Sequence, residues 1–104
     1  MRDYLKFYIN GTWVDPVTPK TLDVINPATE GVAGRISMGS AADVDAAVRA
    51  ARAAFPSFSQ TSVAERMALI EAIIAEYKKR YADMAAAITE EMGAPAMLSQ
   101  KAQA

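Results

Sequence analysis

The sequence predicts an α+β fold, in which antiparallel β-ribbons come first and two to three α-helices follow. Residues 1–39 contain short β-prone runs separated by Asn, Gly and Pro, which is the pattern of small ribbons. From Ser40 onward, apolar residues recur every three or four positions, which is the period of an amphipathic helix. We therefore expect β-ribbons over residues 1–39 and helices over the rest of the chain.

Four strands are expected within the ribbons. An Asn-Gly pair joins Leu5–Ile9 to Thr12–Val14, and both positions of such a pair tolerate the positive φ of a two-residue hairpin turn. A third strand, Thr21–Ile25, ends at Asn26-Pro27, where the Asn side chain can close a turn. The fourth strand is Val32–Met38. Ribbons of this size are marginally stable alone, so we expect them to pack on another element.

The first helix is expected over residues 40–55. Ser40 and Asp43 have the spacing of a capping box, in which each residue satisfies a backbone N–H near the helix start. Pro56 lacks a backbone N–H, so we expect the helix to end there.

A long helix is expected over residues 62–92, and the rest of the chain is organised around it. Ser62 and Glu65 form a second capping pair, and Gly93 suits the left-handed residue that closes a helix. The spacing places one apolar stripe on a single face. Its members are Met67, Ile70, Ile74, Tyr77, Tyr81, Met84 and Ile88.

The stripe is broad in its first half, where Leu69 and Ile73 lie beside it, and it narrows past Arg80. A bend near residue 80 is compatible with this change. Residues 95–104 read as the start of a further helix that stops without a cap, as in a truncated chain.

The charge balance argues against polyanionic partners. The chain has 11 basic and 12 acidic residues, so neither nucleic acid nor an anionic membrane surface is expected to bind. No stretch has the length of a membrane span, and the first residues lack the apolar core of a signal peptide. We expect a cytoplasmic protein.

The sequence contains no Cys and no His, which excludes a thiol nucleophile, an imidazole base and the commonest metal ligands from these residues. Glu90 and Glu91 are adjacent carboxylates, but neighbours on a helix point about 100° apart, so they do not form an acid–base pair. No glycine-rich phosphate loop follows a strand. Composition and spacing therefore show no catalytic constellation.

Five weak motifs nevertheless occur in a fixed order along the chain: Ile9–Trp13, Val24–Gly31, Asp43–Phe55, Glu65-Arg66 and Ile88–Pro95. As an ordered set they resemble the N-terminal part of the NAD(P)-dependent aldehyde dehydrogenase superfamily. The resemblance implies that residues 1–104 are the N-terminal part of a cofactor-binding domain, within a larger α/β, Rossmann-type dehydrogenase subunit.

The resemblance also implies an oxidoreductase that converts an aldehyde to a carboxylic acid with NAD or NADP. In that family the catalytic Cys, the Glu that activates water and the cofactor-gripping Lys lie downstream of the matched region. We therefore expect no catalytic or cofactor-binding residues in this chain, no cofactor bound by it alone and no activity from it alone. The implied partners are the remainder of the subunit and further copies, in a dimer or tetramer.

One metal site is implied. Some members of the family bind a monovalent cation through main-chain carbonyls that correspond to Val24 and Ile25. The family's assisting carboxylate corresponds to Gln103, an amide, and this departure weakens the site because hard cations prefer carboxylate oxygens.

A different class of function is also compatible with the sequence. The chain could be a non-enzymatic helical oligomerisation or interaction module, with the stripe from Met67 to Ile88 as a coiled-coil seam. The shoulder formed by Leu69 and Ile73 favours a globular neighbour instead. No feature of the sequence indicates a small-ligand carrier.

Overall fold

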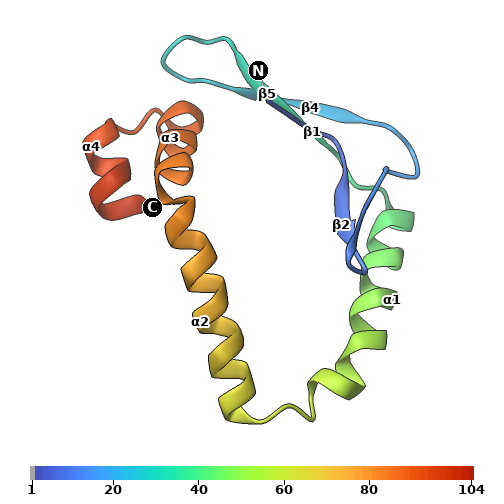
Figure 1. The fold of residues 1–104 in the computed structure, drawn as a ribbon. Helices are drawn as coiled ribbons and strands as arrows, with labels where there is room; N and C mark the ends of the chain where they lie inside the picture. The colour runs from blue at the N-terminus through green and yellow to red at the C-terminus, as the bar shows by residue number, and fades with distance from the viewer. Residues whose placement is uncertain (1) are drawn as a thin grey trace. The chain divides into compact units, whose positions relative to one another are not determined.

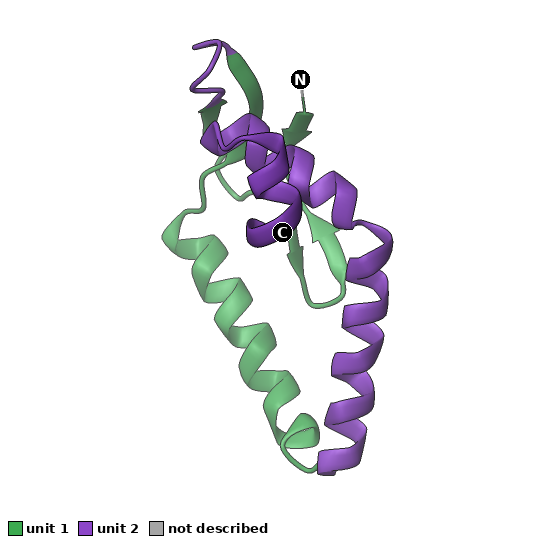
Figure 2. Ribbon diagram, turned by 90° about the vertical axis from the view of Figure 1, so that its left-hand side faces the viewer, with its two compact units in different colours: residues 1–24, 32–60 green, residues 25–31, 61–104 purple. Residues whose placement is uncertain are grey.

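The computed structural model describes residues 2–104, which form two compact units (Figure 2). The first unit consists of the chain up to Val24 and of residues 32–60. The second consists of residues 25–31 and 61–104. The small sheets with helices confirm the predicted α+β class.

The strands form two sheets (Figure 1). One has three strands in the order β1-β5-β4, and the other is the hairpin β2-β3. The bounds are β1 (Arg2–Tyr4), β2 (Phe7–Ile9), β3 (Thr12–Val14), β4 (Thr21–Ile25) and β5 (Val32–Ser37).

The β2-β3 hairpin turns at Asn10 and Gly11, as predicted. Both residues have positive φ, 54° and 76°, which is the backbone that an Asn-Gly pair adopts at little cost. The strands are antiparallel, and Tyr8 lies opposite Trp13. Their rings are in contact, with centroids 5.2 Å apart.

The prediction of exclusively antiparallel ribbons is wrong for β1, which pairs in parallel with β5. A parallel pair needs a long connection, and here the hairpin and β4 lie between the two strands in sequence. Gly34 permits the pairing, because a Cβ at this position would lie 2.2 Å from the carbonyl oxygen of Arg2. The polar Arg-Asp-Tyr sequence of β1 gave no strand signal.

The predicted Asx turn after β4 is confirmed. Asn26 Oδ1 accepts from the Ala28 N–H at 2.9 Å, and the Asn26 N–H donates to the Gly31 carbonyl at 2.9 Å. At the other end of the two strands, the Met38 N–H donates to the Lys20 carbonyl at 2.7 Å. These bonds show that β4 and β5 run in opposite directions.

Helix α1 (Ala41–Phe58) is capped by Ser40 and Asp43 in the predicted reciprocal arrangement. The prediction that Pro56 ends the helix is wrong, because the helix continues to Phe58. Proline has a helical φ and near the end of a helix removes only one hydrogen bond. The turn beyond it is still closed, since the Ser59 N–H donates to the Phe55 carbonyl at 2.8 Å.

The expected long helix is two helices, α2 (Val63–Lys79) and α3 (Tyr81–Met92). Arg80 separates them with φ −111° and ψ 9°, outside the helical region. The Tyr77 and Tyr81 rings meet edge to face across this junction, with centroids 6.0 Å apart. The Ser62–Glu65 capping box is confirmed.

The end of α3 and the residues after it form a compact corner of the second unit. Gly93 closes α3 in the left-handed conformation, as predicted, with φ 73°. Helix α4 (Ala96–Leu98) follows and continues into η1 (Ser99–Gln103), a wider π-helical turn. Tyr81 Oη donates to the Gln100 carbonyl and ties η1 to the start of α3.

The core is thin. Among residues 2–104, the buried apolar side chains are Ala33 and Ala85, and the buried polar ones are Asp43 and Ser99. No helix in this range combines the length and apolar character needed to cross a lipid bilayer.

Candidate functional site

The most enclosed carboxylate of the first unit is Asp43, at the start of α1. It is 6% exposed and accepts hydrogen bonds from the backbone N–H groups of Ser40 at 2.8 Å and Val17 at 2.9 Å. The Ser40 hydroxyl donates to it at 2.9 Å. The backbone bond from Ser40, followed by that from Val17, lowers the pKa of Asp43 below its usual value, against the opposing effect of burial. Asp43 therefore joins the loop before β4 to the start of α1.

Glu65 has the same role at the start of α2. Its carboxylate accepts from the Ser62 N–H at 2.6 Å, and this bond lowers the pKa of Glu65. Both shifted carboxylates are thus helix caps that accept a backbone hydrogen bond from the serine before the helix. Their pKa shifts have a structural explanation and do not indicate acid–base catalysis.

Two hollows of the first unit lie between the hairpin and α1. The larger, about 580 Å³, extends from Ile9 and Val17 to Arg49 and Ala53, and the smaller, about 410 Å³, lies beside Phe7 and Val44. Asp43 borders both. The Thr12 hydroxyl in the larger hollow donates to the Ile9 carbonyl at 3.3 Å, and the Lys6 amine in the smaller one forms an ion pair with Asp15 at 3.7 Å. These contacts are structural and do not indicate a nucleophilic site.

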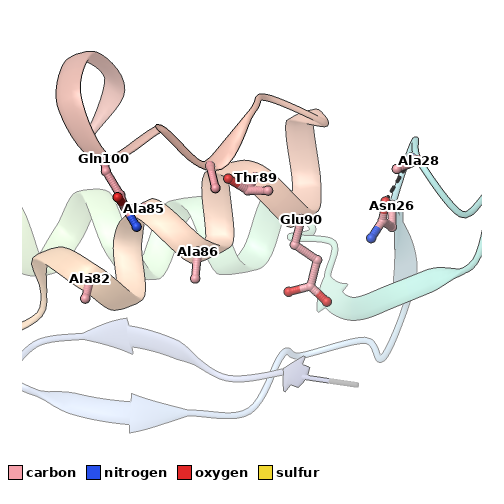
Figure 3. Close-up of a pocket in the computed structure, with 9 residues that line it drawn as sticks. Asn26, Ala28, Ala82, Ala85, Ala86, Thr89, Glu90 and Gln100 are labelled. Carbon is pink, nitrogen blue, oxygen red and sulfur yellow. Dashed lines mark hydrogen bonds between the residues drawn. The ribbon is translucent and has the colours of Figure 1, made fainter. Parts of the chain in front are cut away.

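The second unit contains a hollow of about 420 Å³, which borders α3 (Figure 3). Ala82, Ala85 and Ala86 lie along its α3 side. Its polar lining is Asn26, Thr89, Glu90 and Gln100. The Thr89 hydroxyl donates to Ser99 Oγ at 2.8 Å, and Asn26 Oδ1 is used in the Asx turn.

Sequence reasoning did not predict this hollow. The only signal in the sequence is the run of alanines in α3, which also simply favours a helix. The one hydroxyl in the lining, Thr89, donates to Ser99 Oγ and not to a base, so the hollow does not show the nucleophile–base pair of an active site.

The residues predicted to bind a cation lie at the end of a strand. Val24 and Ile25 are the last two residues of β4, and Gln103 is in η1 with its side chain exposed. Val24 and Gln103 belong to different units. Within residues 2–104, no three carboxylates are grouped so that they could hold a metal ion. The cation site stays a prediction.

The sequence profile of the aldehyde dehydrogenase family matches residues 13–103. A presumed aldehyde dehydrogenase of Staphylococcus aureus strain bovine RF122 / ET3-1 is 52% identical over 101 residues, which are 97% of this chain and 21% of that protein. The chain thus spans about one fifth of the length of this relative.

Solved structures give the same result. The crystal structure of an aldehyde dehydrogenase from Bartonella henselae matches 99% of this chain and 22% of its own, with 48% identity and a TM-score of 0.97. A Pseudomonas syringae aldehyde dehydrogenase, solved as a mutant with NAD+ and octanal, matches 94% of this chain and 20% of its own, with 46% identity and a TM-score of 0.91. The chain belongs to the aldehyde dehydrogenase family and corresponds to the N-terminal segment of such enzymes.

The starts of α1 and α2 differ from the usual binding site of a dinucleotide phosphate. A pyrophosphate is usually bound by free N–H groups at a helix N-terminus. At α1 and α2 the capping pairs place the carboxylates of Asp43 and Glu65 at these N-termini. A dinucleotide phosphate there would meet like charge, so these two helix starts do not provide its site.

Proposed function

We propose that this chain is the N-terminal part of the cofactor-binding domain of an aldehyde dehydrogenase, which oxidises an aldehyde to a carboxylic acid with NAD or NADP. The observation that supports the proposal best is the near-complete structural match to the Bartonella henselae enzyme, with a TM-score of 0.97. NAD is favoured because several matched structures, including one from Mycobacterium tuberculosis, contain NAD+.

In this proposal the chain has a structural role and is inactive alone. The sequence has no Cys to attack an aldehyde, and its two carboxylates with shifted pKa values are helix caps. The remainder of the subunit supplies the reacting groups and the dinucleotide site. We further propose a cytoplasmic enzyme that assembles as a dimer or tetramer, which cell fractionation and light scattering of the full-length protein would test.

The test compares two proteins. One is the 104-residue chain, and the other is a chimera in which this chain replaces the 101 matched residues of the Staphylococcus aureus relative. An aldehyde that the unaltered Staphylococcus aureus relative oxidises is added with NAD+ or NADP+, and formation of reduced cofactor is followed by absorbance. We expect turnover by the chimera and none by the isolated chain. Turnover by the isolated chain would show that the proposal is wrong.

The alternative of an oligomerisation module with one continuous helical seam loses support from the structure. The stripe from Met67 to Ile88 is divided between α2 and α3, because Arg80 leaves the helical conformation. A coiled-coil seam requires an uninterrupted helix over several heptads. The family match also accounts for the whole of this region.

A further inference from the structure

Helix α2 exposes an apolar face along its whole length. No residue of α2 is buried, and seven of its large apolar side chains are between 38% and 65% exposed. These side chains form the α2 apolar face: Val63, Met67, Leu69, Ile70, Ile73, Ile74 and Tyr77. Exposed apolar patches of this extent usually mark an interaction surface.

The α2 apolar face covers one side of the helix, and this side includes one charged residue, Arg66, whose guanidinium donates to the Thr61 carbonyl. Steps of three and four residues align five of its members, and Leu69 and Ile73 widen the face on one flank. The opposite side has alanines and Lys79, whose ammonium group pairs at 2.6 Å with Glu76, at the edge of that flank. This sidedness indicates a helix that is buried on one face and solvated on the other.

The accessible surface area of the chain also indicates that apolar surface is left uncovered. The chain exposes 8065 Å² at a mass of 11.1 kDa. Two separate compact bodies of half this mass would together expose about 6,800 Å², by the usual scaling of surface area with mass. The chain therefore exposes more surface than its two units would if each had a complete core.

We propose that the α2 apolar face docks onto an apolar surface of the remaining part of the dehydrogenase subunit. The proposal rests on the proposed function. The same fold occurs as 22% of the Bartonella henselae chain, so the longer protein keeps this helix and adds several times as many residues that can cover it.

A second copy of this chain fits the α2 apolar face less well. Helix α2 has 17 residues, which is fewer than the three to four heptads of a coiled coil, and the shoulder at Leu69 and Ile73 is broader than an a/d seam. A short, wide face is typical of a helix that packs on a globular neighbour.

Thiol labelling tests the docking directly, because the chain has no Cys of its own. Ile74→Cys places a thiol on the α2 apolar face, and Ala72→Cys places a matched thiol on the opposite side. Each variant is made in the isolated chain and in the chimera, and labelling by a maleimide is followed on the α2 peptide by mass spectrometry. Hydrogen exchange of the α2 amides in the unsubstituted proteins gives a second measurement that needs no variant.

In the isolated chain we expect both thiols to react at similar rates. In the chimera, Ile74→Cys should react at least about tenfold more slowly and Ala72→Cys should change less than about twofold, because only the docked face is closed to solvent. The α2 amides should also exchange more slowly in the chimera.

Equal labelling of Ile74→Cys in the two proteins would overturn the proposal. Protection of this thiol in the isolated chain that increases with concentration would also overturn it, because the occupant would then be a second copy. Turnover is measured separately, with an aldehyde that the unaltered Staphylococcus aureus relative oxidises. A chimera that protects α2 without oxidising this aldehyde contradicts the proposed function and leaves the docking supported.

Discussion

Asp43 shows how one buried carboxylate can hold several segments together. It caps α1 and also accepts the Val17 N–H, from a residue 26 positions earlier in the chain. Its lowered pKa follows from these bonds, so the charged form is the one that the fold stabilises.

The stabilisation by Asp43 should depend on pH. Because its pKa in the folded chain is lower than the ordinary value of 3.8, its contribution is complete above that value and is lost as the pH falls through the folded pKa. We expect Asp43→Asn to lower the urea midpoint at neutral pH, with the difference from the unsubstituted chain disappearing in strong acid. Asp45→Asn, at an exposed position on the same helix, serves as the control and should have little effect. A pH-independent difference would contradict this account.

Gly34 is required by the parallel pairing of β1 with β5. A Cβ there would lie 2.2 Å from the Arg2 carbonyl oxygen, so the strands would have to separate. We expect Gly34→Ala to reduce the free energy of unfolding by about 1–3 kcal/mol, as overpacking usually does. The control is Gly39→Ala, whose Cβ would meet its nearest neighbours at 3.8 Å and 3.9 Å. Urea unfolding that gives equal losses for the two variants would show that the close approach is not the cause.

Among the elements, those with local signals were predictable from the sequence. The two capping boxes, the Asn10-Gly11 hairpin and the left-handed Gly93 each depend on residues within a few positions of one another. The parallel partner of β1 was not predictable, because it depends on contacts between residues more than thirty positions apart. No proline or glycine marks the break at Arg80, and the narrowing of the apolar stripe indicates only that a bend near residue 80 is compatible with the sequence.

The candidate sites also divide into features that residue types alone predict and features that depend on contacts between distant residues. The absence of a catalytic constellation could be predicted, since it depends only on which residue types are present. The hollow beside α3 could not, because it forms where Asn26 and Ala28 of one segment meet Ala82 and Gln100 of others. The spacing of the alanines in α3 does not predict which other segments lie beside them.

The role of Gly93 in closing α3 can be tested by substitution. Gly93 has φ 73°, and a Cβ there would lie 3.0 Å from Pro27 Cγ in the preceding turn. We expect Gly93→Ala to cost about 1–2 kcal/mol of unfolding free energy, because an L-residue is strained in this conformation. Gly31→Ala is a suitable control, since its φ is not positive and its nearest contact is ordinary, at 3.5 Å from Thr29 Oγ1. A smaller loss in thermal or urea unfolding for Gly93→Ala than for Gly31→Ala would contradict the role of the closing residue.

The isolated chain should bind hydrophobic probes, because its core is thin and the α2 apolar face is exposed. We expect it to bind an anilinonaphthalene dye without denaturant, with enhanced emission, because Ala33 and Ala85 are its only buried apolar side chains among residues 2–104. The chimera should bind less dye per molecule. An isolated chain that leaves the dye emission unchanged would contradict the exposure of this face.

The contact between Tyr8 and Trp13 has a spectroscopic consequence. Trp13 is the only tryptophan in the sequence, and its ring lies 5.2 Å from that of Tyr8 across the hairpin. Its fluorescence, including energy received from Tyr8, therefore reports on β2 and β3 within the first unit. The Tyr77–Tyr81 pair lies in the second unit, at the junction of α2 and α3. The chain thus carries an intrinsic optical label for the hairpin, with which the melting of the first unit can be followed separately from that of the helices of the second.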